Sequence, residues 1–504
     1  MEGFQNIALG FATALQPENL LLCLCGVLLG TFIGILPGVG PLITIAVLLP
    51  VTFGLPPEGA IIMLAGIYYG AQYGGSTTAI LVNLPGEASS VVTMMDGHAM
   101  AKRGRAGAAL AIAAIGSFIA GVIGTILIAV FSPALASVAM QFGPAEYFAL
   151  MAFALCCTSA LVQGSVLKGV VMAMLGALVG LIGTDINSGV SRLDFGFREL
   201  SNGIEFSALA IGLFGIAEMV RHLGDPEPKG QVTVKTGRIL PTLEDLKVSI
   251  GPILRGTGLG TLIGILPGAG LSISSFAAYI LEKKVAKDPS QFGKGAIQGV
   301  AAPEAANNAA AQTSFIPTLT LGIPGSATMA LMLGALLIQG ITPGPRIMQE
   351  QPTLFWGLIA SMVIGNLLLL VLNLPLVRLW VKLLDVPYRW LCPAILTFGC
   401  VGIYSIGFAA SDIYIAAAFG LAGYLFLKLD LELAPFILGF ILAPMLEEHF
   451  RRAMLLSRGD LTVFVTHPLS ATFLGLIVVL IGLIGVHKYR SYLADRAAAA
   501  EARG

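Results

Sequence analysis

The chain has 504 residues, of which 56% are hydrophobic and only 11% are charged, and its mean hydropathy is +0.88. Soluble domains carry about a quarter of charged residues, so this composition excludes a soluble globular protein and indicates one with many membrane-spanning segments. The 28 basic side chains balance the 28 acidic ones, so no net charge favours binding to nucleic acid.

The first expected helix is the apolar run from Leu20 to Leu36. The residues before it contain no Lys or Arg, so we expect this run to stay in the protein and not to be cleaved as a signal peptide. It leads into the sequence GTFIGILPGVG, residues 30–40, where Pro lacks a backbone donor and Gly opens unusual φ and ψ angles. We therefore expect the helix to break at Pro37 and to resume from Pro41.

A second expected span, residues 58–82, ends in another break at Leu84-Pro85-Gly86. Further apolar runs follow at 106–131, 145–162, 166–183 and 204–220, and a polar linker over 221–249 then separates two halves of the chain. Counted with the second half, the sequence offers roughly eleven to fourteen membrane segments or half-segments. The expected fold is all-α and polytopic.

The second half repeats the order of the first. GTLIGILPGAG at residues 260–270 matches the opening motif, and Ile323-Pro324-Gly325 takes the place of the second break. We expect a first membrane repeat over 1–220, the linker over 221–249, a second repeat over 250–450, and a C-terminal span with a basic tail over 451–504. Two matching breaks in two halves are typical of the binding site of a secondary transporter.

Loop charges suggest how the halves are oriented. Between its two breaks the second half has a cluster of Lys residues at 283–294, whereas the equivalent stretch 52–60 has no Lys or Arg; after the second break the basic residues lie instead in the first half, at 102–105. Because cytoplasmic loops favour Lys and Arg, this pattern predicts inverted repeats and a cytoplasmic C-terminus. Chance placement of a few charges is the alternative.

Small residues and hydroxyl groups gather at the breaks. A helix that restarts after a break directs free N–H groups and a partial positive charge into the space ahead of it, which attracts carboxylates without a buried Lys or Arg. We therefore expect an anionic substrate to bind at Gly38, Gly40, Gly86, Ser89, Gly268, Gly270, Ser272, Gly325 and Ser326. Broken helices or hinges are expected at Pro37, Pro85, Pro267 and Pro324.

Neutral oxygen atoms near the same breaks suit a sodium ion as coupling ion. The expected ligands are Ser76, Thr77, Asn83, Asn307, Asn308 and Thr313. A simpler interpretation stays open, since Gly-rich stretches also serve helix packing and Ser or Thr in a helix often bonds only to a preceding carbonyl.

Five carboxylates near apolar runs are candidates because an ionisable group at membrane depth is usually functional. They are Glu87, Asp185, Glu218, Glu304 and Asp412, and Glu304 is favoured because it lies just ahead of a break. An enzyme is not expected: the histidines lie in loops or at span ends, and the chain has neither HExxH nor a GxxxxGK[ST] phosphate loop. An anion channel or passive exporter and a membrane scaffold remain as alternatives to a carrier.

Several motifs resemble one known family. They are the doubled GxxIGxLPGxG, the run YYGAQYGGS at 68–76 followed by LPG at 84–86, and PEAANN at 303–308 followed by GIPG at 322–325. Together they are similar to the large membrane subunit of tripartite tricarboxylate transporters, over about residues 15–460.

The resemblance implies a secondary carrier of the bacterial inner membrane that imports tricarboxylates such as citrate, or dicarboxylates. It implies two partners, a small four-span membrane subunit and a periplasmic solute-binding protein, and uptake driven by an ion gradient, usually sodium, without ATP or another cofactor. We expect alternating access, with the breaks near Pro37 and Pro85 meeting those near Pro267 and Pro324 at one midplane site.

Overall fold

Helices make up almost all the regular structure of the computed structural model, which describes residues 2–36, 40–162, 165–185, 188–223, 240–268, 270–376, 379 and 388–501. The expectation of an all-α protein is wrong in one detail. Two short strands, β1 (Gly183–Thr184) and β2 (Ser191–Arg192), pair antiparallel with Gly183 opposite Arg192. They lie where the chain leaves the apolar run, and Gly183 and Gly189 have positive φ angles of 118° and 70° that allow the reversal.

The helices of the first half follow the expected apolar runs closely. They are α1 (Glu2–Ala14), α2 (Pro17–Ile35), α3 (Pro41–Thr52), α4 (Pro57–Val82), η1 (Ala88–Ser90), α5 (Val91–Met100), η2 (Ala101–Arg105), α6 (Ala106–Ala139), α7 (Pro144–Ala160), α8 (Val166–Gly180), η3 (Arg198–Leu200), α9 (Phe206–Ala210), η4 (Ile211–Ile216) and α10 (Ala217–Leu223). Pro stands in the first turn of several of them, where its missing N–H costs nothing.

The second half starts earlier than the expected linker boundary at residue 249. Helix α11 (Leu243–Gly264) begins at Leu243 because Thr242 caps it, accepting from the backbone N–H of Asp245. The other elements are α12 (Gly270–Val285), η5 (Pro289–Gln291), α13 (Gln298–Thr313), α14 (Phe315–Leu321), α15 (Ala327–Ile338), α16 (Ile347–Glu350), α17 (Pro352–Asn373), α19 (Tyr388–Gly407), α20 (Ala410–Lys428), α21 (Leu433–Leu456), α22 (Val463–Thr466) and α23 (Pro468–Glu501).

Six helical segments in the described ranges are long and apolar enough to cross a membrane: Pro17–Ile35, Ala88–Ala139, Pro352–Asn373, Ala410–Lys428, Leu433–Leu456 and Pro468–Val486. Shorter apolar helices accompany them, among them α3, α7, α8 and α15. The chain is therefore a multi-pass membrane protein in which long spans are mixed with helices too short to cross alone.

Glycines let α2 and α4 touch along their backbones. A Cβ atom added at Gly26, Gly30 or Gly34 would come within 2.4 Å of a carbonyl oxygen of α4, those of Met63, Ile67 and Ala71 in turn. Glycine at every fourth residue forms one stripe on the helix, and the absence of side chains along it allows close helix contact. The first GxxIGxLPGxG motif is thus a packing surface up to its break.

Helices α11 and α13 pack in the same way. A Cβ atom at Gly256 would lie 2.3 Å from the Ala302 carbonyl oxygen, and one at Gly260 would lie 2.2 Å from that of Ala306. The glycines again follow one another every four residues and end at the break. In both motifs the helical part ahead of the break therefore packs against a second helix of its own half.

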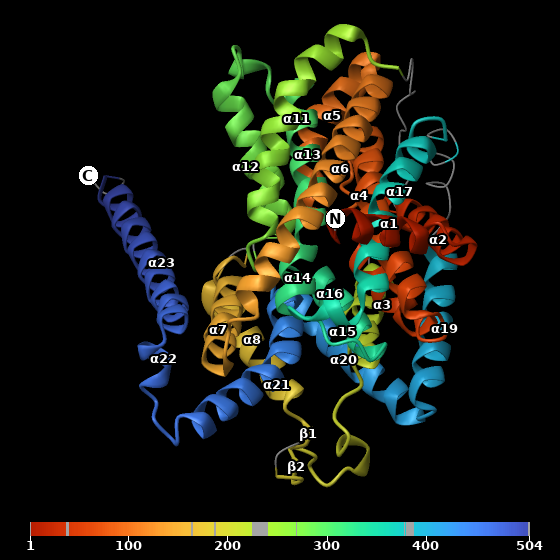
Figure 1. The fold of residues 1–504 in the computed structure, drawn as a ribbon. Helices are drawn as coiled ribbons and strands as arrows, with labels where there is room; N and C mark the ends of the chain where they lie inside the picture. The colour runs from red at the N-terminus through yellow and green to blue at the C-terminus, as the bar shows by residue number, and fades with distance from the viewer. Residues whose placement is uncertain are drawn as a thin grey trace.

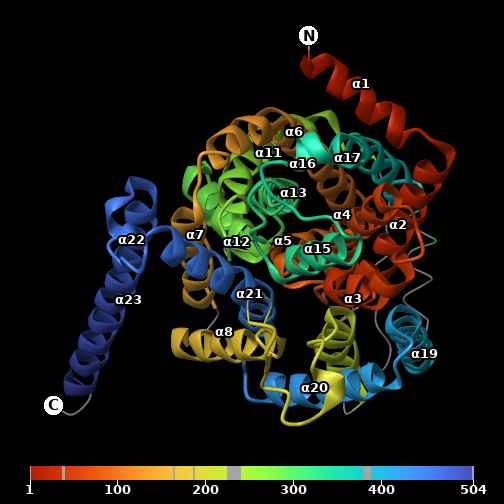
Figure 2. The same cartoon turned by 60° about the horizontal axis from the view of Figure 1, so that its bottom comes forward.

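Helix α13 lies at the centre of the helix bundle. It contacts α4, α5, α6, α11 and α12, and Figure 2 shows it surrounded by neighbouring helices. Helix α23, by contrast, stands away from the main body and packs chiefly against α7 (Figure 1).

A buried carboxylate holds the start of α13. Asp96 of α5 is fully buried and accepts hydrogen bonds from the backbone N–H groups of Gly295 (2.7 Å) and Ala296 (2.8 Å) and from the Tyr279 hydroxyl (2.9 Å). These bonds link α5, α12 and the segment before α13. They position a helix of one half against helices of the other.

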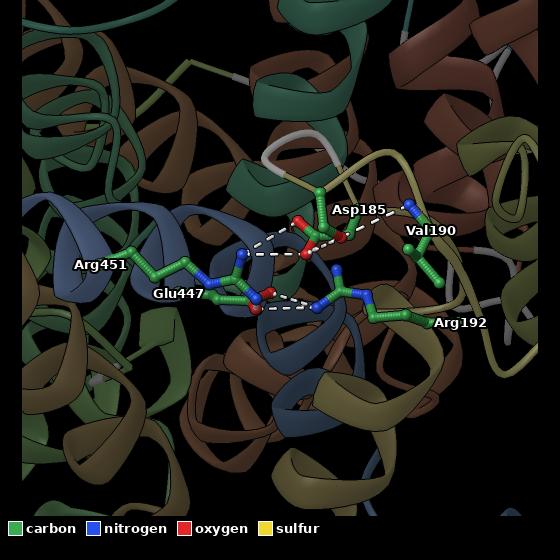
Figure 3. A network of polar contacts seen from close by, with 6 residues as sticks. Asp185, Val190, Arg192, Glu447 and Arg451 are labelled. Atoms are coloured by element: carbon green, nitrogen blue, oxygen red, sulfur yellow. Dashed lines mark hydrogen bonds and ion pairs between the residues drawn. The ribbon is translucent and has the colours of Figure 1, made fainter.

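A second set of ionic contacts fastens the β1–β2 ribbon to α21 (Figure 3). The Arg451 guanidinium donates to both carboxylate oxygens of Asp185, at 3.1 and 2.9 Å, and Arg192 donates to Glu447 at 2.8 and 3.0 Å. Arg451 also contacts Glu447 at 2.6 Å. Asp185, one of the candidate site carboxylates, therefore has a role in holding the ribbon.

We expect Arg451→Gln to loosen the ribbon. The side chain is 35% exposed, so solvent screens its ion pairs, and their loss should have a small effect. We expect roughly fivefold faster hydrogen exchange of the Asp185 amide, whose N–H donates to the Val190 carbonyl. Arg452→Gln is the matched control, because this neighbour is 61% exposed and pairs with Glu448 one turn away. Equal exchange in the two variants would show that the ribbon does not depend on Arg451.

Candidate functional site

The candidate site is built around α13, a helix that is buried along its whole length although it carries several polar side chains. Glu304, Asn307, Asn308 and Gln312 are each 1% exposed. The alanines between them leave room for neighbouring helices to approach closely. Because buried polar groups normally have partners, these side chains mark either a polar network or a ligand site.

Glu304 is held by hydroxyl groups from the other half of the chain. Ser76 of α4 donates to its Oε2 atom at 2.6 Å, and Thr93 of α5 donates to its Oε1 atom at 2.5 Å. A small cavity of about 10 Å³ opens beside them and is also lined by Tyr73, Thr77 and Ser117. This space is about that of a single water-sized occupant.

Within the described ranges, no basic side chain neutralises the Glu304 carboxylate. Among the ion pairs of the described residues, none involves Glu304 or Glu87. A bare carboxylate in such a place carries a large desolvation cost, which falls when a proton or a small cation joins it. The described part of the chain has no group of three or more His, Cys, Asp or Glu residues that could hold a metal ion.

Glu87 connects the first-half break to α13. It is the N-cap residue of η1, directly after Leu84-Pro85-Gly86, and its carboxylate accepts from the Ser89 hydroxyl in the first turn. Asn307 of α13 donates to the same oxygen at 3.2 Å and to Gln72 Oε1 at 2.9 Å. The helix that starts at η1 therefore already has a negative side chain of the protein, Glu87, at its N-terminus.

The second-half break has the same backbone shape but a neutral cap. Gly322 has φ 69° and ends α14, as Asn83 with φ 61° ends α4. Ser326 caps α15, its Oγ atom accepting from the Met329 N–H at 3.2 Å. The hydroxyl of Tyr68, a fully buried residue of α4, is near enough to interact with the Ser314 and Ser326 hydroxyls but makes no hydrogen bond of ordinary length and angle in the structure.

The breaks of the second half lie against each other, and in the first half the end of α2 reaches the break at Gly86. The Gly268 N–H, at φ 75°, donates to the Gly325 carbonyl at 2.9 Å. In the first half, a Cβ atom at Gly86 would come within 2.4 Å of the Gly34 carbonyl oxygen. Tyr68 of the first half lies near Ser326 of the second, and Asn307 of the second half donates to Gln72 and Glu87 of the first. The described parts of the breaks therefore lie in one region.

The structure brings only some of the expected site residues together. Ser76, Thr77, Asn307 and Asn308 lie around Glu304 or Glu87, with Asn308 donating to Ser117 at 2.7 Å, and Ser89, Gly86, Pro85, Ser326, Gly325, Pro324, Gly268 and Pro267 belong to the break segments next to them. Pro37 and Gly38 lie outside the described residues.

Other expected residues lie apart from this network. Thr313 donates to the carbonyls of Thr261 and Ala309, Asn83 is exposed at the end of α4, and Ser272 is half-buried in the first turn of α12. Gly40 and Gly270 have open space around the position of a Cβ atom. Of the remaining candidate carboxylates, Glu218 pairs with Arg221 at 3.4 Å and Asp412 lies in the first turn of α20.

Sequence reasoning missed four side chains of the network: Tyr68, Gln72, Thr93 and Ser117. Gln72 had a usable signal, because an amide inside an apolar run must find a partner. Thr93 and Ser117 had none, since hydroxyls are common in membrane helices and most bond only to their own helix.

Buried polar groups beside interrupted helices in a multi-pass helical protein are typical of membrane transport proteins. Comparison with known families agrees with this class. Residues 20–438 match the model described as "Tripartite tricarboxylate transporter TctA family". The chain belongs to this family, which is one of transporters and not of enzymes, so it is a membrane component of a tripartite tricarboxylate transport system.

Two relatives from Agrobacterium vitis are similar over most of their own length. One, described as "Uncharacterized 52.8 kDa protein in TAR-I ttuC' 3'region", is 54% identical over 486 residues, covering 96% of this chain and 97% of the relative. The other, "Uncharacterized protein in TAR-II ttuC' 3'region", is 57% identical over 232 residues, covering 46% of this chain and 96% of the relative. No solved structure matches the chain.

Proposed function

We propose that this chain forms the membrane pathway for uptake of an organic tri- or dicarboxylate and that a cation gradient drives the uptake. Glu304 is the observation that carries the coupling. It is 1% exposed and lies between the two halves, and the side chains that donate to it are neutral. Binding a cation there removes an unfavourable buried charge, so cation occupancy and the packing of the two halves become linked.

Sodium is the coupling cation that we favour. The Ser76, Thr93 and Glu304 side chains supply hard oxygen atoms, and Thr77 and Ser117 line the adjoining cavity. Of the sodium ligands predicted from the sequence, this proposal retains Ser76 and Thr77. It makes Glu304 the central ligand and leaves out Asn83 and Thr313. ATP has no part in the proposed cycle.

An inverted two-fold repeat and alternating access complete the proposed mechanism. Matching glycine contacts of α2 with α4 and of α11 with α13, and matching left-handed residues ahead of the second breaks, support a repeat. The loop charges support opposite orientations of the halves. The segments bearing the breaks would move against the flanking spans to expose the site on either side in turn.

Family membership supports the proposed partners and location. Tripartite systems have partner subunits and a carboxylate substrate, and for this chain we propose a small four-span membrane subunit and a periplasmic solute-binding protein. The proposed location is the bacterial inner membrane with a cytoplasmic C-terminus. Substrate choice would then be shared with the binding protein.

Uptake of labelled tri- and dicarboxylates tests this function. The chain is reconstituted in vesicles with the small subunit, the binding protein is added, and an inward sodium gradient is imposed or omitted. Sodium-dependent accumulation of one anion is expected. Equilibration without accumulation under any cation gradient would instead establish a channel or passive exporter, and no anion flux at all would favour a scaffold.

A further inference from the structure

The helices that follow the second break of each half start at residues of different charge, one negative and one neutral. The helix after the first-half break starts at Glu87, whose carboxylate bonds to Ser89 and Asn307. The helix after the second-half break, α15, starts at neutral Ser326. Gly86 and Gly325 precede these two residues in matching tripeptides, so Glu87 and Ser326 occupy the same place in the two halves.

A negative group at a helix start is stabilised by the partial positive charge of the free N–H groups there. In the first half, the protein's own Glu87 supplies that negative group. In the second half, the twelve-residue helix α15 has no such side chain at its cap. Its positive end is therefore available to an external anion.

A second observation points to a ligand at the start of α15. The ring of Tyr68 lies 6.1 Å from that of Phe315, the residue after Ser314. Its hydroxyl is fully buried, is near enough to interact with the Ser314 and Ser326 hydroxyls, and makes no hydrogen bond of ordinary length and angle in the structure. A buried hydroxyl without a partner loses the hydrogen bonds it would make in water, so an arriving acceptor would restore them. Gln72, four residues after Tyr68 on α4, shares the Asn307 amide with Glu87, at 2.9 and 3.2 Å, so the first-half helix start also lies next to α4.

We propose that one substrate carboxylate binds at the start of α15, held by the Tyr68 hydroxyl and the first-turn N–H groups, and that Glu87 occupies the equivalent place in the other half as a permanent internal carboxylate. The chain thus has one anion site although its breaks come in two copies. Glu87 prevents a second substrate carboxylate from binding at the first-half helix start by charge repulsion. This inference rests on the proposed carboxylate transport and names its binding residues.

The test measures exchange of labelled citrate across vesicles loaded with unlabelled citrate, which needs no net cation movement. Tyr68→Phe is expected to raise the half-saturating citrate concentration about tenfold or more, because a hydrogen bond to a charged group is lost. Tyr69→Phe is the matched control: its hydroxyl is also buried, but it lies against Gly365 of α17 and interacts with Cys23 and Ser361 and not with Ser326. The control should change half-saturation less than about twofold.

A charge substitution tests the same site independently. Ser326→Glu copies the first-half arrangement and should abolish citrate exchange, whereas Ser326→Gln, of equal size but neutral, should retain part of it. The inference would be overturned if Tyr68→Phe and Tyr69→Phe changed half-saturation equally, or if Ser326→Glu and Ser326→Gln reduced citrate exchange equally. Either result would leave the proposed transport function standing. Absence of citrate exchange in the unmodified protein would instead count against the proposed function for tricarboxylates.

Discussion

Replacing Glu304 by Gln is expected to abolish sodium-driven accumulation while leaving the protein folded. Glutamine has the shape of the carboxylate but no charge, so it attracts a cation much more weakly, and the loss of about 3 kcal/mol or more of binding corresponds to a fall of at least about 100-fold in the driven rate. Folding should be preserved, because a neutral group between Ser76 and Thr93 removes a desolvation cost.

The measurement is the initial rate of labelled anion uptake with an inward sodium gradient, compared with anion exchange in vesicles without a gradient. Exchange should persist in Glu304→Gln because the anion site proposed at α15 is intact. Glu448→Gln is the control, since this carboxylate is 46% exposed and pairs with Arg452 on its own helix. Full sodium-driven accumulation in Glu304→Gln would refute the coupling role of Glu304.

Gly260→Leu should prevent the two helices of the second half from packing. The first side-chain carbon would lie 2.2 Å from the Ala306 carbonyl oxygen and 2.6 Å from the Ala306 Cα atom, and neither backbone atom can move without shifting α13. Overpacking of a tight contact costs about 1–3 kcal/mol for small additions, and a leucine adds more. We expect little or no correctly assembled protein.

The fraction of detergent-extracted protein that stays monodisperse after heating reports this effect. Gly260→Ala should lower the temperature at which half of the monodisperse protein is lost. Gly260→Leu should leave almost no protein to extract. Gly258→Ala is a control on the same helix, because no heavy atom lies within 4 Å of its added Cβ. If Gly258→Ala and Gly260→Ala lowered this temperature equally, the close contact between α11 and α13 would not determine the stability of the protein.

Much of the helical organisation was predictable because its causes are local. Apolar runs, Pro in first turns and Leu-Pro-Gly sequences specify where helices begin and end, and the structure places helix ends at or near the expected breaks. The β1–β2 ribbon was missed because two-residue strands leave no period in a sequence. The start of α11 was missed because the capping by Thr242 was not considered.

The candidate site was predictable only in part. Glu304, Ser76 and Asn307 were named as candidates because polar groups are costly in apolar segments, and the structure brings them into one network. Thr313 and Asn83 satisfied the same criterion and lie elsewhere. Residue type and spacing do not say which side of a helix faces a partner helix from the other half.

The sequence by itself determined that this is a multi-pass helical membrane protein and where many of its helices end, since these features depend on hydropathy and on the backbone properties of Pro and Gly. Only the tertiary structure decided that Thr93 and Ser76 meet Glu304 and that Tyr68 meets the start of α15. These partners are more than 200 residues apart, and their contact depends on how each helix is rotated and how deeply it sits, which glycine-mediated packing between helices sets.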